Sequence, residues 1–292
     1  MHCNLPPQPS FDGSGPPGVA AALNSHAYGW GDFMRLRIEA KLDYATQDLR
    51  TILLQIEAAE NVADQTVVES ALDIADVQSH VRVPADEGVG TRSWIEVSDR
   101  FTCTYRATVD VLRPPVDLGL LAQVALPDLP GEVVKFLLPS RFCPSDKFGT
   151  FVENEFGSLA GGARVKAMRD WIEENLSYVP GSSDAETTVV DTFIKRQGIC
   201  RDYAHLMATL ARASNIPARV VCVYAPDVTP PDFHAVAEVY LDGAWYLVDG
   251  TGMAPPETMV RVGVGRDAAD IAFLSIYGPN ALKSQAVSVE RV

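Results

Sequence analysis

The first half of the chain alternates apolar and polar residues. From Met34 to Leu42 every second residue is apolar, and the positions between them are charged. A period of two predicts a half-buried β-strand, because successive side chains of a strand point to opposite faces. Five further stretches read as strands, at 49–57, 67–74, 79–84, 92–98 and 101–112. We therefore expect an antiparallel β-sandwich.

Two proline-rich stretches divide the chain. Residues 1–33 are rich in Pro, Gly, Ala and Ser without periodicity, which is typical of a disordered leader or of sequence upstream of a true start at Met34. Residues 113–130 contain four prolines and are expected to form a linker. The sandwich is therefore expected at 34–112, and a second domain at 131–292.

The second domain has helical spacing at first. Apolar residues recur every three or four positions in the stretch GARVKAMRDWIEENLSY at 162–178, which predicts an amphipathic helix. A second helix is expected at 186–196, and a third begins at Cys200. Three strands follow, at 218–226, 233–241 and 244–250. Together with the sandwich, these elements predict an α+β protein.

The last two strands carry a histidine and an aspartate in a fixed relation. Asp242-Gly243 between alternating apolar runs signals a two-residue hairpin turn, which sets the register and places His234 opposite Thr251. His234 and Asp249 then become diagonal neighbours on one sheet face, with backbones about 7–8 Å apart. A carboxylate at that distance can accept the ring N–H of His234, fix its tautomer and stabilise the imidazolium.

Cys200 supplies a nucleophile. It follows a turn at Gly198 and opens a helix, whose N-terminal partial positive charge favours thiolate over thiol. A cysteine at a helix start, a histidine on a strand and an aspartate after the next strand are the components of a Cys-His-Asp acyl-transfer site. We therefore expect Cys200, His234 and Asp249 to form a catalytic triad.

These residues lie in a longer motif. The run GICRDYAHLMATLARASNIPARVV, followed by DFHAVAEVYLDGAWYLVDGT, resembles the core of the transglutaminase-like superfamily, and in particular its bacterial cysteine proteases. The resemblance implies a papain-like fold for residues 131–292 after an N-terminal β-sandwich. It also implies that Cys200 is the nucleophile, His234 the base and Asp249 the residue that orients His234.

Other residues are candidates for supporting roles. The backbone N–H of Cys200 is a natural oxyanion donor, and Tyr178 and Gln197 are candidates for the second donor. Asp202 could brace the start of the helix. His205 could join Cys200 in a zinc site, but it lies one and a half turns along the helix, which favours a structural hydrogen bond. We expect no metal and no cofactor, since no phosphate loop, EF-hand or Rossmann pattern occurs.

Composition limits the partners and the compartment. A net charge of −14 disfavours nucleic acid, and no apolar run reaches the roughly 18 residues of a membrane span. The five cysteines are widely spread and show no CxxC pairs, which favours a reducing compartment. With no visible signal sequence, a cytoplasmic location is expected. Cys103, Cys143 and Cys222 read as small core residues.

The expected function is cysteine-dependent hydrolysis of an amide bond in a peptide or protein, through an acyl-enzyme on Cys200. Three alternatives use the same fold. The acyl group could pass to an amine, as in a protein-glutamine transglutaminase, or could come from a small thioester. The chain could also be a non-catalytic interaction module that retains the fold.

Overall fold

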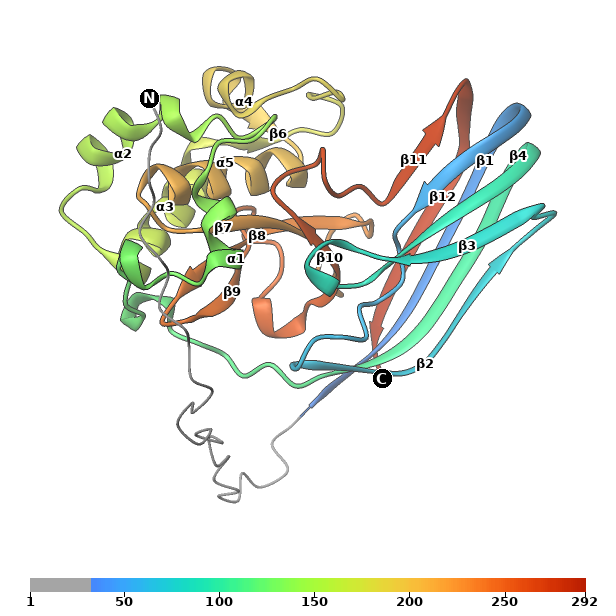
Figure 1. The fold of residues 1–292 in the computed structure, drawn as a ribbon, viewed down its shortest axis with the longest axis horizontal. Coiled ribbons are helices and arrows are strands. Elements are labelled where there is room, and N and C mark those ends of the chain that lie inside the picture. The colour runs from blue at the N-terminus through green and yellow to red at the C-terminus, as the bar shows by residue number, and fades with distance from the viewer. Residues whose placement is uncertain (1–32) are drawn as a thin grey trace, which may run out of the picture. The chain divides into compact units, whose positions relative to one another are not determined.

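The computed structural model describes residues 33–292, so the predicted leader at 1–33 lies outside the described residues except for Phe33. Within the described part of the chain, helices pack on a four-stranded antiparallel sheet, which in turn contacts a six-stranded antiparallel sheet (Figure 1). This mixture of helices and antiparallel sheets confirms the predicted α+β class.

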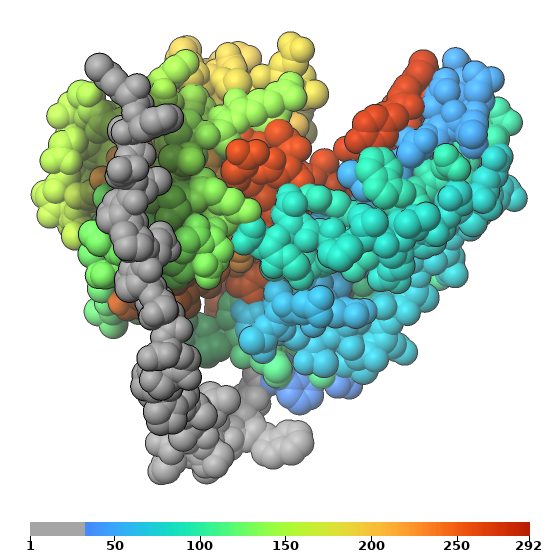
Figure 2. Space-filling view, in the orientation of Figure 1, coloured from blue at the N-terminus to red at the C-terminus, as the bar shows by residue number. Residues whose placement is uncertain are grey.

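The six-stranded sheet has β1 and β4 at its centre. Its strands are β1 (Met34–Leu54), β2 (Gln65–Ile74), β3 (Ser79–Pro84), β4 (Thr91–Val111), β11 (Leu274–Tyr277) and β12 (Asn280–Arg291). β2 and β3 pair with successive parts of β4, whereas β11 and β12 pair with successive parts of β1. Figure 2 shows the C-terminal strands, in red, beside the blue atoms of β1.

The structure corrects the predicted β-sandwich at 34–112. These residues form one sheet rather than two facing sheets, and β11 and β12 at the C-terminal end of the chain complete it. Its apolar face packs against the second half of the chain, where Tyr105 of β4 stacks on Tyr224 with ring centroids 6.4 Å apart. A second sheet is not needed, because the four-stranded sheet and its loops already cover the apolar face.

Four of the predicted strands merge into two long ones. Sequence alone suggests breaks near 43–48 and 99–100, but β1 and β4 continue through both. Asp48 and Asp99 have positive φ angles of 57° and 63°, and the β1–β4 register shifts between Ala45 and Leu49. The polar interruptions are therefore β-bulges, which bend a strand without ending it.

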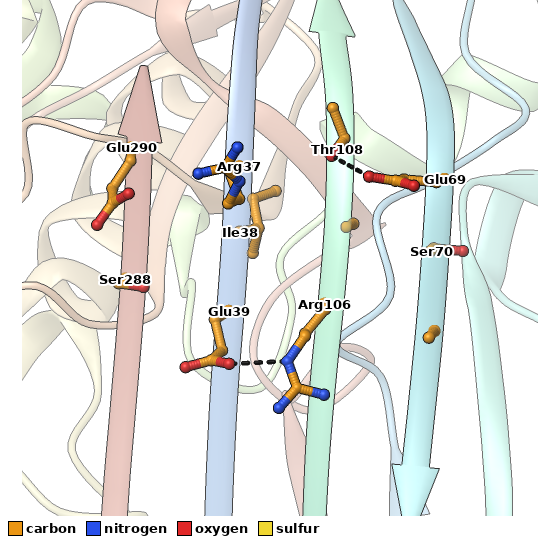
Figure 3. Close-up of a pocket in the computed structure, with 11 residues that line it drawn as sticks. Arg37, Ile38, Glu39, Glu69, Ser70, Arg106, Thr108, Ser288 and Glu290 are labelled. Atoms are coloured by element: carbon orange, nitrogen blue, oxygen red, sulfur yellow. Dashed lines mark hydrogen bonds and ion pairs between the residues drawn. The ribbon is translucent and has the colours of Figure 1, made fainter. Parts of the chain in front are cut away.

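The other face of the six-stranded sheet carries charged and polar side chains. Arg106 donates to Glu39 at 2.8 Å across neighbouring strands, and Thr108 donates to Glu69 at 2.8 Å (Figure 3). These side chains border a shallow cavity of about 520 Å³ on this face. Cross-strand pairs of this kind explain the alternating pattern from which the strands were predicted.

The second half of the chain follows the predicted order of helices and strands. The helices are α1 (Gly131–Val134), α2 (Gly149–Phe156), α3 (Gly161–Asn175), α4 (Val189–Lys195) and α5 (Cys200–Ala213). The strands are β5 (Ser177–Tyr178), β6 (Gln197–Gly198), β7 (Ala218–Tyr224), β8 (His234–Leu241), β9 (Ala244–Val248) and β10 (Val260–Gly265). β5 and β6 form a short parallel pair, and the others form a sheet in the order β10-β7-β8-β9.

The predicted linker at 113–130 packs against α3. It contains two short 3-10 helices, Leu118–Leu120 and Leu126–Asp128. Gly162 of α3 donates its N–H to Leu121 O at 2.9 Å. A Cβ at Gly162 would lie 1.6 Å from Leu118 O, so only glycine permits this close approach.

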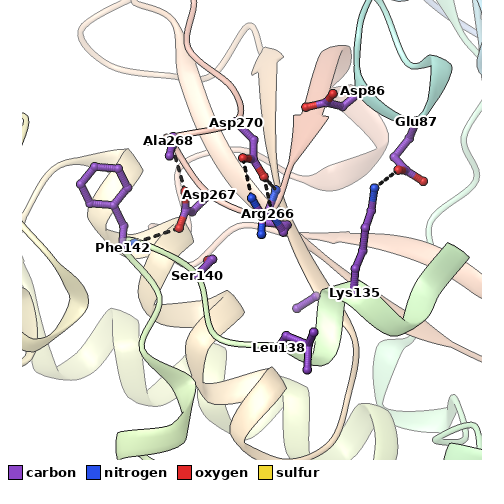
Figure 4. A network of polar contacts seen from close by, with 12 residues as sticks. Asp86, Glu87, Lys135, Leu138, Ser140, Phe142, Arg266, Asp267, Ala268 and Asp270 are labelled. Atoms are coloured by element: carbon purple, nitrogen blue, oxygen red, sulfur yellow. Dashed lines mark hydrogen bonds and ion pairs between the residues drawn. The ribbon is translucent and has the colours of Figure 1, made fainter.

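The segment after β10 is tied to the α5 side of the protein (Figure 4). Phe142 donates its N–H to Asp267 Oδ2 at 2.8 Å, and Ala268 donates its N–H to His205 Nε2 at 3.1 Å. Arg266 and Asp270 form an ion pair at 2.7 Å within the segment. These bonds hold the chain that leaves β10 before it crosses to β11.

A buried ionic network joins the two sheets. Glu238 of β8 is fully buried and accepts hydrogen bonds from Arg219 at 2.8 Å and from Arg261 at 2.6 Å. Arg261 also donates to Asp64 at 2.6 Å, and Arg113 donates to the same carboxylate at 2.6 Å. Burial alone would raise the pKa of Glu238, but the charges of Arg261 and Arg219 lower it, so the carboxylate stays ionised.

Among residues 33–292, no helix combines the length and the apolar character that crossing a membrane requires.

Candidate active site

Cys200 is the first residue of α5, where the helix begins at a tight turn. Asp202 is buried and accepts the N–H of Ile199 at 2.8 Å, which satisfies a backbone donor at the helix start. A Cβ at Gly198 would lie 2.7 Å from the Cβ of Asp202, so glycine is needed for the carboxylate to fold back. The structure therefore gives Asp202 a bracing role and puts Cys200, which is partly exposed, at the positive end of α5.

Replacing Asp202 by Ala is expected to lower the free energy of unfolding by about 1–2 kcal/mol, because the Ile199 N–H loses its acceptor. It should also slow alkylation of Cys200, since the helix start becomes less ordered. Asp191→Ala is the matched control, because Asp191 accepts the N–H of Thr188 at 2.9 Å at the start of α4. The control should reduce stability without slowing Cys200. Equal effects of both variants on Cys200 would contradict a local role.

The β8–β9 hairpin has the predicted register. Leu241 pairs with Ala244 across the Asp242-Gly243 turn, as expected from the dipeptide. His234 is the first residue of β8 and Asp249 directly follows β9, so both lie at the same end of the hairpin. The structure brings them together, with His234 Nε2 3.1 Å from Asp249 Oδ2.

Asp249 is held by its own turn. Its Oδ1 accepts the backbone N–H of Thr251 at 2.8 Å and the hydroxyl of Thr251 at 2.7 Å. Its Oδ2 accepts the N–H of Ala254 at 3.1 Å, in addition to His234. Sequence reasoning did not find the part played by Ala254, because any residue except proline can supply a backbone donor.

The electrostatics of the pair favour an imidazolium. Burial lowers the pKa of His234, but the hydrogen bond to Asp249 and the neighbouring Cys200 outweigh it and raise the pKa to about 10. Burial alone would raise the pKa of Asp249, but its bonds to His234 and Thr251 lower it. The contribution of His234 to the free energy of unfolding is complete below about pH 6.5. It is lost as the pH rises through the pKa of His234 in the folded protein. The stabilisation from Asp249 is present above about pH 4 and is lost as the pH falls further.

His234 also lies beside the nucleophile candidate. Nε2 binds Asp249, whereas Nδ1 is buried and has no hydrogen-bond partner among the described residues, so Nδ1 is the nitrogen that remains for Cys200. Cys200 is near enough to add to the raised pKa of His234. The three predicted triad residues are therefore together in the structure, with His234 in the middle.

Tyr178 lies beside Cys200. It pairs with Gly198 across β5 and β6, which brings its side chain next to the start of α5. Burial and the charge of Cys200 raise the pKa of Tyr178, while a hydrogen bond from the Cys200 backbone lowers it, and the net direction is upward. The phenol therefore keeps its proton at neutral pH and is available as a hydrogen-bond donor.

Gln197 is less well placed. It pairs with Ser177 in the same short sheet, but it is exposed. Within the described part of the chain its side chain makes no hydrogen bond to Cys200 or to any other group. Of the two candidates for the second oxyanion donor, the structure places Tyr178 at Cys200.

His205 has a separate structural environment. It is buried, stacks on Phe142 with ring centroids 5.3 Å apart and accepts the N–H of Ala268. Burial lowers its pKa to about 3, so it is neutral. Its position agrees with the expected structural hydrogen bond rather than with a zinc site shared with Cys200.

Comparison with known proteins identifies the family. Residues 152–250 match the sequence profile of the transglutaminase-like superfamily. A crystal structure from Cytophaga hutchinsonii, described as a candidate cysteine protease, superposes with a TM-score of 0.85 at 32% identity and covers 89% of this chain and 91% of its own.

Uncharacterized mycobacterial proteins are also similar. One from Mycobacterium leprae is 29% identical over 135 residues, which are 43% of this chain and 48% of that protein. One from Mycobacterium tuberculosis is 25% identical over 224 residues, which are 64% of this chain and 71% of that protein. The chain thus spans about half of the Mycobacterium leprae relative. By its sequence motifs and its fold, this chain belongs to the transglutaminase-like superfamily.

Proposed function

We propose that the protein is a cysteine-dependent amide hydrolase that acts on peptides or proteins. The observation that carries the proposal is the His234–Asp249 hydrogen bond of 3.1 Å beside Cys200 at the start of α5. A nucleophile, a base that contacts it and a group that orients the base are the parts needed for acyl transfer.

The first step forms an acyl-enzyme. Cys200 Sγ attacks the amide carbon, and the carbonyl π electrons move to oxygen to give a tetrahedral oxyanion. His234, which is an imidazolium over the neutral pH range, donates its Nδ1 proton to the leaving nitrogen as the C–N bond breaks. The products are a free amine and a thioester on Cys200. Asp249 keeps the imidazole in the orientation that this transfer needs.

Tyr178 is the proposed second donor to the oxyanion. Its side chain lies beside Cys200, and both the backbone N–H and the charge of Cys200 act on the pKa of the phenol. A substrate oxygen bound between the two residues would accept hydrogen bonds from the Cys200 N–H and the Tyr178 O–H. Each such donor typically contributes about 10²–10³-fold to the rate.

The second step decides between hydrolysis and amine transfer. Water attacks the thioester after losing a proton to His234, and the C–S bond breaks to release a carboxylic acid and Cys200. We take hydrolysis as the reaction because the 32% identical relative from Cytophaga hutchinsonii is described as a candidate cysteine protease. The cytoplasmic location is likewise a proposal, and it rests on the sequence alone.

Acetylation by p-nitrophenyl acetate tests the proposal without knowledge of the natural substrate. Intact-mass analysis should show an acetyl group on Cys200, which water removes, and Cys200→Ala should lose at least about 10⁴-fold of the turnover. Cadaverine added to the acetyl-enzyme after the unreacted ester has been removed separates the outcomes, because free ester would acetylate the amine directly. Release of free acetate supports a hydrolase, whereas release of acetyl-cadaverine would show that the protein is a transferase. Absence of a Cys200 adduct would favour the non-catalytic module.

A further inference from the structure

Strand β9 is an edge of the four-stranded sheet. The strand order β10-β7-β8-β9 gives β9 a partner on one side, and within residues 33–292 no strand pairs with its other side (Figure 1). An edge strand presents unpaired N–H and C=O groups, which are a template for another extended chain.

The hairpin register shows which backbone groups are free. Asp242 and Gly243 have positive φ angles of 45° and 80°, as in a two-residue type I′ turn, so Ala244 exchanges hydrogen bonds with β8. In an antiparallel pair the residues that bond to the partner alternate with residues whose N–H and C=O point away. Trp245 and Leu247 therefore direct their backbone groups to the open side. No hydrogen bond to these groups is found in the described part of the chain.

A groove runs along this open side. It has a volume of about 770 Å³, and β9 forms one wall. The linker forms another wall with Pro114, Pro115 and Val116, and the turn after Asp249 contributes Pro255. Val116 is 45% exposed, so it presents an apolar side chain to the groove.

The charges along the groove are largely satisfied within the protein. Asp64 pairs with Arg113 at 2.6 Å, and Asp249 binds His234. Lys166 and Arg169 of α3 line the groove, but they pair with acidic residues of their own helix. Asp117 and Glu257 also line the groove, without an ion pair in the part of the chain that the structure describes. Four acidic and three basic residues therefore line it, and this near balance of charge matches an uncharged chain.

We propose that the groove beside β9 binds an uncharged, extended segment of a partner protein, which adds to the sheet as a fifth strand. Backbone hydrogen bonds to Trp245 and Leu247 supply affinity, and alternate side chains of the segment contact the apolar linker wall. Because β9 has five residues, the bound segment is expected to pair over about the same length. The inference does not depend on the proposed amide hydrolysis.

The groove also touches the support of the candidate active site. Ala254 lines the groove and donates its N–H to Asp249, which in turn binds His234. A segment bound there contacts Asp249 and the turn that fixes its carboxylate, whereas Cys200 is not among the residues that line the groove.

Selection of random cysteine-free heptapeptides displayed on phage tests the proposal, with the full-length Cys200→Ala protein as bait. Enriched peptides should be uncharged, should slow amide hydrogen exchange in 244–248, and should bind Val116→Glu at least about tenfold more weakly, because that change places a charge in the groove. Leu120→Glu is the matched control, since Leu120 is 82% exposed and does not line the groove.

Backbone chemistry gives a second criterion. Two N-methylated versions of the most enriched peptide are compared, one methylated at its odd-numbered amides and one at its even-numbered amides. One of the two should lose binding, because strand addition needs the N–H groups that face β9. Thermal melting of the two glutamate variants checks that they fold. Failure to enrich any peptide, equal binding to Val116→Glu and the parent, or unchanged binding of both N-methylated versions would overturn the proposal.

Discussion

At pH 6, iodoacetamide is expected to alkylate Cys200 about 10²-fold faster than an ordinary thiol. An unperturbed thiol, with a pKa near 8.5, is less than about 1% ionised at that pH, whereas a thiolate paired with an imidazolium reacts directly. His234 supplies the imidazolium, since its pKa is raised to about 10. His234→Ala should therefore remove most of the advantage. Peptide mass mapping after timed labelling from pH 5 to 9 measures the rate at each cysteine.

The other described cysteines serve as internal references. Burial raises the pKa of Cys103 to about 12 and that of Cys143 to about 11, and it also raises the pKa of Cys222. All three should label slowly in the folded protein. His80→Ala is the control variant, because His80 lies in β3 and contacts Ser93 rather than the candidate site. Labelling of Cys200 at the rate of Cys103 would refute activation of the thiol and favour the interaction-module alternative.

Glu238→Gln is expected to lower the free energy of unfolding by about 3–5 kcal/mol, because it leaves the buried charges of Arg219 and Arg261 without their shared carboxylate. In a protein of this size that loss corresponds to a fall of about 10 °C in the melting temperature. Differential scanning calorimetry measures the change. Because the network links β8 to Asp64, which precedes β2, both sheets should lose stability together.

Glu39→Gln is the matched control for this prediction. Glu39 accepts a hydrogen bond from Arg106 at 2.8 Å, but on the solvent face of the six-stranded sheet (Figure 3). Water and salt screen that pair, so the variant should melt close to the parent. If Glu238→Gln melts as close to the parent as the control does, the buried network does not contribute as proposed.

Local signals were enough to predict much of the candidate site. The Asp242-Gly243 turn has φ angles that few other dipeptides adopt easily, and it fixes the hairpin register on which the His234–Asp249 distance depends. Helix α5 begins at Cys200, as the turn at Gly198 indicates. Both features depend on interactions between residues that are near in sequence, so a local sequence motif is enough to predict them.

Strand limits were less predictable. The acidic turn-like residues around Asp48 and Asp99 read as strand ends, but pairing along β1 and β4 holds both chains extended through the bulges. The predicted sandwich failed for a related reason. Alternation shows that one face of a strand is buried, but it does not show what covers that face.

The sequence by itself determined the α+β class, the order of elements in the second half of the chain and the pairing of His234 with Asp249. Only the tertiary structure decided that β11 and β12 join β1, that Tyr178 rather than Gln197 lies at Cys200, and that β9 borders an open groove. Those features depend on backbone hydrogen bonds and contacts between distant segments. Because every residue except proline carries the same backbone donor and acceptor, such pairings leave little trace in residue identity.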